Sequence, residues 1–185
     1  LFLEEIWSRN FTNLFIAPLK LKEIVVALIF TALVRTLIGL VPAILLTSPL
    51  FGVSILKLGL PLLLLFLSLY IFGITLGLFV SAGLIRFGPS FENIAWSSLF
   101  LLAPLGCIYY PIEILPDFFQ IIAKSLPLVY IFDEARNILL NGFVNYENLR
   151  QAYYLNLAYL AFGIFLFYSS FLKARIKGTL INMGE

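Results

Sequence analysis

The chain has 185 residues, of which 62% are apolar and 12% are charged, and its formal net charge is +2. Soluble domains carry about 45–50% apolar and about 25% charged residues, so this composition and a mean hydropathy of +1.04 indicate a membrane protein. The single cysteine, Cys107, and the absence of histidine exclude an intramolecular disulfide, cysteine or histidine metal centres and Ser-His catalysis. The small net charge and the lack of a Lys/Arg-rich block give no sign of a nucleic-acid partner, and we expect no cofactor.

An amphipathic segment, residues 4–22, opens the chain. Apolar residues recur there at near-helical spacing with charged residues between them, namely Ile6, Trp7, Phe11, Leu14 and Phe15. The pattern predicts a short helix at the membrane interface. It fits an interfacial anchor without a partner as well as a docking helix for a soluble subunit. The first three residues, Leu-Phe-Leu, could end an earlier span, so we expect upstream residues to be missing.

Four apolar runs are long enough for transmembrane helices, because a helix needs about 20 residues, with a lower limit of about 17, to cross the hydrocarbon core. These runs cover residues 24–46, 58–85, 94–110 and 151–172. The alternating segments of about ten residues that are typical of a membrane barrel do not occur. We predict an all-α membrane protein with four transmembrane helices that form one domain over residues 1–185.

Arg35 interrupts the first predicted span near its middle. A charge at that depth costs about 2.5–3.5 kcal/mol on insertion scales, whereas each neighbouring Leu, Ile, Val or Phe recovers about 0.3–0.6 kcal/mol, so the helix still inserts. A membrane arginine usually faces a bundle interior or a cavity. Arg35 is therefore a pathway or interface residue, a structural ion-pair partner, or part of a span that is displaced from this placement.

Small residues recur at every fourth position of the second predicted span, at Gly73, Gly77 and Ser81. Small residues at this spacing allow two membrane helices to approach closely. Because the pattern is common in membrane helices, it predicts a helix-packing surface and indicates no function.

Prolines divide residues 111–142, which separate the last two predicted spans. Each of Pro111, Pro116 and Pro127 lacks an N–H and clashes with the preceding turn, so one straight helix cannot contain them. The segment is too apolar for a solvated loop, and irregular backbone near a bilayer needs protein or water around it. We predict a re-entrant hairpin of two short helices, with Asp133 and Arg136 one turn apart on the second. Four apolar residues of the first are expected to pack against neighbouring spans: Phe118, Phe119, Ile121 and Ile122.

Lysine and arginine near the span ends favour one orientation, because these residues concentrate in cytoplasmic loops. A cytoplasmic N-terminal segment places seven of them inside, at Arg9, Lys20, Lys22, Arg86, Lys173, Arg175 and Lys177. Four then lie outside, at Lys57, Lys124, Arg136 and Arg150. We expect both chain ends in the cytoplasm and residues 111–142 on the outer face of a cell (inner or plasma) membrane.

Two stretches resemble ABC type-2 transporter permeases. The first contains Glu5, Arg9-Asn10-Phe11-Thr12, Leu14 and Pro18 and is followed by Glu23, as in the cytoplasmic motif of that family. The second contains Gly106, Tyr110-Pro111, Leu115-Pro116, Leu126-Pro127, Asp133, Arg136 and Gly142, as in the family's stretch between its last two spans. The family has Gly-Thr where this chain has Phe11-Thr12, and it has six spans, so the first two would be missing here.

The resemblance implies the permease subunit of an ATP-driven exporter that dimerises, as a homodimer, and couples to a separate cytoplasmic ABC ATPase subunit. The chain has no phosphate-loop motif for ATP, so it is not itself expected to be an enzyme. Residues 1–20 would form the coupling segment, through Glu5, Arg9, Leu14, Phe15 and Pro18. Pathway or gate residues would be Arg35, Pro111, Pro116, Pro127, Asp133 and Arg136.

Two other classes stay open from hydropathy alone, a channel or secondary transporter and a structural polytopic membrane subunit. A channel or secondary transporter is expected to carry more polar groups within its spans, where only Arg35 is charged. A membrane-embedded enzyme is disfavoured because there is no histidine and no paired carboxylate motif within the spans. The transported substrate does not follow from the sequence, since fold alone does not settle function.

Overall fold

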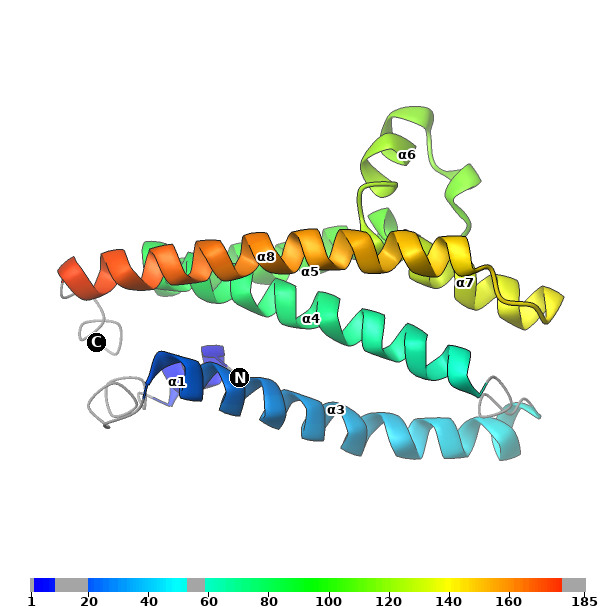
Figure 1. Cartoon of the computed structure of the whole chain (residues 1–185), viewed down its shortest axis with the longest axis horizontal. Coiled ribbons are helices and arrows are strands. Elements are labelled where there is room, and N and C mark those ends of the chain that lie inside the picture. Colours follow the sequence, from blue (N-terminus) through cyan, green and yellow to red (C-terminus); the bar gives the residue numbers. More distant parts are fainter. Residues whose placement is uncertain (1, 9–19, 53–58, 178–185) are drawn as a thin grey trace.

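The computed structural model describes residues 2–8, 20–52 and 59–177, and over these residues the chain is helical without strands. The helices are α1 (Phe2–Trp7), α3 (Leu21–Phe51), α4 (Leu60–Phe87), η2 (Pro89–Phe91), α5 (Glu92–Leu105), η3 (Ile112–Ile114), α6 (Asp117–Ala123), α7 (Pro127–Asn141) and α8 (Tyr146–Lys177). The three long helices α3, α4 and α8 follow the long axis of the molecule (Figure 1). The predicted all-α class is therefore confirmed.

Three helices among the described residues are long and apolar enough to cross a membrane. They are Leu21–Leu50 in α3, Leu60–Phe87 in α4 and Tyr146–Ile176 in α8. The predicted count of four is not confirmed, because α5 has 14 residues. At 1.5 Å per residue α5 reaches about 21 Å, short of a hydrocarbon core of about 30 Å.

The backbone after α5 explains why the third predicted span is shorter than its apolar run. Pro104 lies in the last turn of α5, and Cys107 takes the left-handed conformation with φ 53°, which a helix cannot continue. The chain then leaves the bundle through η3 and α6 and returns as α7 (Figure 1). α5 begins where α4 ends, and α7 ends at the opposite end, beside the start of α8.

Glycine and proline set the other helix ends. α3 stops at Gly52, which has φ 69° and whose N–H donates to the Ser48 carbonyl at 3.0 Å, a left-handed helix end that favours glycine. α4 starts after Gly59 with Pro61 in its first turn, where the missing N–H costs nothing. The N–H of Glu147 donates to the Asn145 side chain at 3.0 Å, which caps the start of α8.

The core lies between α4 and α8. One cluster joins Leu78, Ala82, Leu84 and Ile85 of α4 to Phe167, Phe171 and Ala174 of α8. A second joins α4 and α8 to α7 through Leu65, Ile131, Ile138, Leu149 and Ala152. A buried polar contact lies between the long helices, where Asn156 Nδ2 donates to the carbonyl and Oγ of Ser68 at 3.0 and 2.8 Å.

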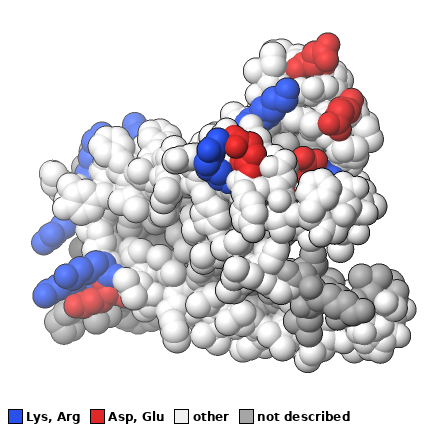
Figure 2. Space-filling model, turned by 45° about the vertical axis from the view of Figure 1, so that its right-hand side comes forward, with Lys and Arg blue, Asp and Glu red and all other residues white. Residues whose placement is uncertain are grey.

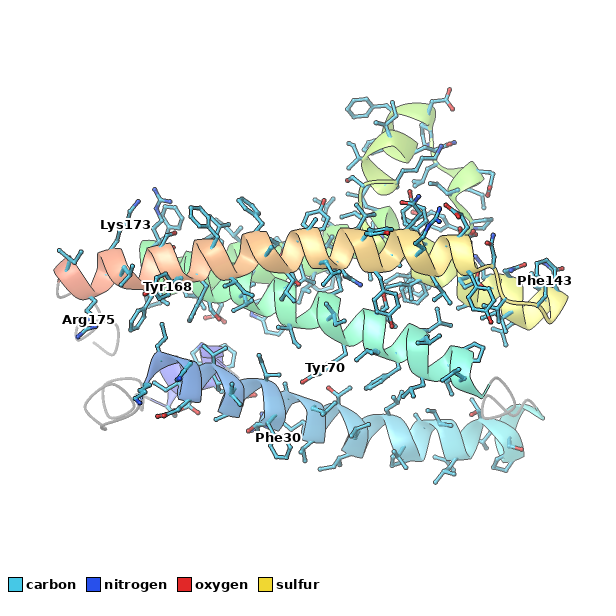
Figure 3. All side chains as sticks on the ribbon, in the orientation of Figure 1. Phe30, Tyr70, Phe143, Tyr168, Lys173 and Arg175 are labelled. Carbon is cyan, nitrogen blue, oxygen red and sulfur yellow. The ribbon has the colours of Figure 1, made fainter. Side chains whose placement is uncertain are left out.

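Basic residues lie at one end of the bundle. α3 begins there with Lys20 and Lys22, α4 ends there with Arg86, and Lys173 and Arg175 lie on the last turns of α8 (Figure 3). Figure 2 shows lysine and arginine gathered at this end, with a largely uncharged surface beside them. We call it the basic end. The helix pairs α3–α4 and α4–α8 are antiparallel, which brings these distant residues together.

Candidate functional site

Arg35 of α3 pairs with Glu4 of α1. Its Nη1 donates to both carboxylate oxygens of Glu4, at 2.9 and 2.6 Å. The side chains are 57% and 48% exposed. The hydrogen bond from Arg35 lowers the pKa of the Glu4 carboxyl below its ordinary value. Of the alternatives open from the sequence, the ion-pair partner is therefore realised in the structure.

A second polar contact joins α1 to α5. Trp7 Nε1 donates to Oε2 of Glu92 at 3.0 Å, and Trp96 Nε1 donates to Oε1 of the same carboxylate at 3.3 Å. Glu92 is the first residue of α5, where a negative charge interacts favourably with the helix dipole. Of the predicted coupling residues, Glu5 is half-buried in α1. Arg9, Leu14, Phe15 and Pro18 lie outside the described residues.

A large apolar groove of about 1000 Å³ lies between α3, α4 and α5. Tyr70 extends from α4 towards α3 (Figure 3) and donates from its hydroxyl to the Ile29 carbonyl at 2.5 Å. Gly73, Gly77 and Ser81 lie on the groove wall. An added Cβ at Gly73 or Gly77 would meet nothing within 4 Å. Gly73 and Gly77 therefore leave room on the groove side of α4, whereas Ser81 is buried.

Residues 106–126, the projecting segment, stand away from the long helices (Figure 1). Cys107 and Ala123 of the segment form a small buried core with Val129 of α7. Four apolar side chains of α6 are instead exposed, at Phe118 (69%), Phe119 (44%), Ile121 (73%) and Ile122 (38%). The expectation that they pack against neighbouring spans is not confirmed, because these side chains stay exposed although α6 contacts α5 and η3.

The prolines of this region lie where the predicted breaks require them. Pro111 precedes η3, Pro116 precedes α6, and Pro127 is in the first turn of α7. Two helices therefore flank Pro127, at residues 117–123 and 127–141, as predicted. A re-entrant position in a membrane is not shown by this arrangement.

Arg136 of α7 fixes the base of the projecting segment. Its Nη1 donates to the carbonyl of Cys107 at 2.8 Å, and its Nη2 lies 3.6 Å from Oδ1 of Asp133. Asp133 and Arg136, which were expected one turn apart, thus form an ion pair, and Arg136 adds a bond across the segment. Burial raises the pKa of the Cys107 thiol, and the nearby Arg136 charge partly opposes this.

Glu134 is fully buried beside this pair, and sequence reasoning missed it. Its Oε1 accepts from the backbone N–H of Asn145 at 2.7 Å, and its Oε2 accepts from Nδ2 of Asn148 at 3.3 Å. The carboxylate thus ties α7 to the start of α8. One signal could have found it, because Glu134 lies three residues after Ile131 and four before Ile138, on the buried face of the helix.

Comparison with known proteins decides the family. A family model described as ABC-2 type transporter matches residues 2–140. The chain belongs to the ABC-2 type transporter family. The matched residues run from α1 into α7 and include both stretches that carry the resemblance in sequence, apart from Gly142. No curated protein and no solved structure matches the chain.

As an ABC-2 family member, the chain is a multi-pass membrane protein and a permease component of an ABC transporter. Permeases of this family lack an ATPase site of their own and associate with an ATPase subunit and the membrane. Within this family domain, the contacts of α1 join the first described residues to α3 and to α5.

Proposed function

We propose that this chain is the membrane-spanning permease subunit of an ATP-driven exporter, which forms the translocation path and couples to a separate cytoplasmic ATPase. The observation that carries the proposal is the position of α1. This helix contains Glu5 and ends at Trp7, shortly before the other predicted coupling residues, and it bonds to both α3 and α5. A partner that moves residues 9–19 would therefore act on the membrane domain through α1.

The coupling role of residues 1–20 is tested by a Glu5→Ala/Arg9→Ala double variant. Both residues flank the turn at Ser8, and a docking surface with one acidic and one basic residue suits an ATPase surface of mixed charge. We expect the variant to insert normally while ATP hydrolysis is uncoupled from transport. Wild-type ATPase binding and transport in this variant would refute the coupling role.

The proposed orientation places the basic end in the cytoplasm, as the excess of lysine and arginine favours. In a Cys107→Ser background, cysteines at Ser8 and Ile176 should resist a membrane-impermeant maleimide in intact cells. A cysteine at Leu140, which is exposed at the opposite end, should react. Labelling of Ser8→Cys or Ile176→Cys from outside would reverse this orientation.

The projecting segment and α7 are proposed to help gate the exit on the outer face. Support comes from the way Arg136 ties the start of the segment to α7, so that the segment and α7 form one unit. A Pro116→Ala/Pro127→Ala double variant should reach the membrane at normal levels with lost or leaky transport. Unchanged transport in this variant would contradict a gating role of the segment.

We propose that a second copy of the permease packs against the surface of α4 that carries Gly73 and Gly77. Both positions are open in the described chain, and small residues at this spacing suit close helix contact. Gly73→Leu/Gly77→Leu should weaken assembly, measured by crosslinking in membranes. Leu63→Ala, at an exposed position of the same helix, is the control. Normal assembly of the glycine variant would exclude this surface.

A further inference from the structure

Two side chains of α1, Glu4 and Trp7, each bond to a different helix of the membrane domain. Glu4 accepts two hydrogen bonds from Arg35 of α3, and Trp7 donates one to Glu92 of α5. These partners lie 31 and 85 residues away in sequence. Local chain geometry therefore does not impose either contact.

The two side chains share one face of α1, because residues three apart on a helix are neighbours. The helix ends at Trp7, and its last turn is continued by a bond from the Ser8 N–H to the Glu4 carbonyl at 2.9 Å. Both contacts thus lie close in sequence to residues 9–19, which hold the other predicted coupling residues. A displacement of residues 9–19 would therefore reach Glu4 and Trp7 through a single helical turn.

Both contacts are hydrogen bonds to a charged carboxylate, so they resist separation of α1 from its two partner helices. Arg35 holds Glu4 through two charge-assisted hydrogen bonds, at 2.9 and 2.6 Å, which are stronger than neutral ones. The lowered pKa of Glu4 keeps its carboxyl charged at neutral pH. Glu92 receives two indole N–H groups, from Trp7 and Trp96, and a charged acceptor strengthens such bonds.

We propose that Glu4 and Trp7 are positioning residues that transmit displacement of residues 9–19 to α3 and to α5, each through its own contact. This inference rests on the proposed function, and it adds the route by which the partner acts. Glu4 moves α3 through Arg35. Trp7 moves α5 through Glu92, so the two helices respond separately when one contact is removed.

The test measures two distances in the complex with the phosphate-loop ATPase, with and without ATP and orthovanadate. Spin labels are placed on the exposed positions Ile38 of α3 and Phe100 of α5, each paired with a label at Tyr168 of α8, in a Cys107→Ser background. In the wild-type complex both distances should shift on trapping. Glu4→Gln should lose at least half of the α3 shift only, and Trp7→Phe at least half of the α5 shift only.

Two controls separate transmission from folding. Glu147→Gln removes an ion pair with the same 2.6 Å distance within α8 and should keep both shifts. Glu4→Arg/Arg35→Glu restores the pair with reversed charges and should recover the α3 shift.

The outcomes are distinct. Wild-type protein that does not co-purify with the ATPase refutes the proposed function itself. If the complex forms, three results overturn the inference: no wild-type shift, full shifts in Glu4→Gln and Trp7→Phe, or nucleotide-free distances already altered by these substitutions, since that marks a purely structural role.

Discussion

Arg136 donates a 2.8 Å hydrogen bond from Nη1 to the backbone carbonyl of Cys107, across 29 residues of sequence. Cys107 follows α5 in a left-handed conformation, and Arg136 lies in the middle of α7. The bond therefore closes the projecting segment into a loop whose two ends meet. Gly106 supports the same junction, since an added Cβ there would lie 2.8 Å from Cδ1 of Leu128.

Replacing Arg136 by Met should destabilise this junction. The substitution keeps the apolar stem but leaves the Cys107 carbonyl without its donor, which costs about 1–3 kcal/mol for a buried group. Denaturant titration in detergent measures the loss. Arg150→Met, which removes an exposed ion pair on α8, should cost about 0.5 kcal/mol or less. Equal effects of the two substitutions would contradict the structural role of Arg136.

Glu134→Gln should loosen the turn between α7 and α8. The two donors, the Asn145 N–H and Asn148 Nδ2, bond to different oxygens of Glu134, and an amide replaces one of these oxygens by an NH2 donor, so one of the two bonds is lost. We expect a loss of about 1–2 kcal/mol and faster hydrogen exchange at the Asn145 amide. Glu113→Gln, at an exposed position of the projecting segment, serves as the control. Unchanged hydrogen exchange at Asn145 in Glu134→Gln would contradict the role of Glu134 in holding α7 to the start of α8.

Two glycines of α4 should respond in opposite directions to alanine. A Cβ at Gly83 would lie 2.2 Å from the Phe91 ring, which would have to leave its stack on Phe87. Overpacking of this kind costs about 1–3 kcal/mol. Gly73→Ala meets open space and should gain up to about 1 kcal/mol in helix propensity in the monomer. The same sign for both changes in detergent unfolding would contradict this packing of α4.

Contact of α1 with α3 should depend on pH through Glu4. Its pKa is lowered from 4.5 by the hydrogen bond from Arg35. A lowered carboxyl pKa contributes stability that is complete above 4.5 and is lost as pH falls through the lowered value. The distance between spin labels at Ser8 and Ile38, in a Cys107→Ser background, should thus stay constant from pH 7 to 5 and broaden in stronger acid. Glu4→Gln should show one distribution throughout, and broadening between pH 7 and 5 in wild type would contradict the pairing.

Local steric rules explain which parts of the fold were predictable. Pro116, Pro127 and Gly142 mark helix boundaries that sequence indicates, because proline and glycine restrict backbone conformation wherever they occur. The third span was overestimated because hydropathy over residues 94–110 does not register the left-handed turn at Cys107.

Non-local contacts account for what was missed. The pairing of Arg35 with Glu4 and the burial of Glu134 depend on partners 31 and 14 residues away, which no local pattern specifies. The exposure of Phe118 and Ile121 in α6 likewise follows from the path of the projecting segment and not from its composition.

The central claim is that this ABC-2 permease works with a separate ATPase. The most direct measurement reconstitutes the wild-type chain in lipid nanodiscs with a phosphate-loop ATPase subunit and compares ATP hydrolysis with that of the ATPase alone. We expect a stable complex whose rate of ATP hydrolysis differs severalfold from that of the free ATPase. A properly inserted permease that neither binds the ATPase nor changes its rate would contradict the account.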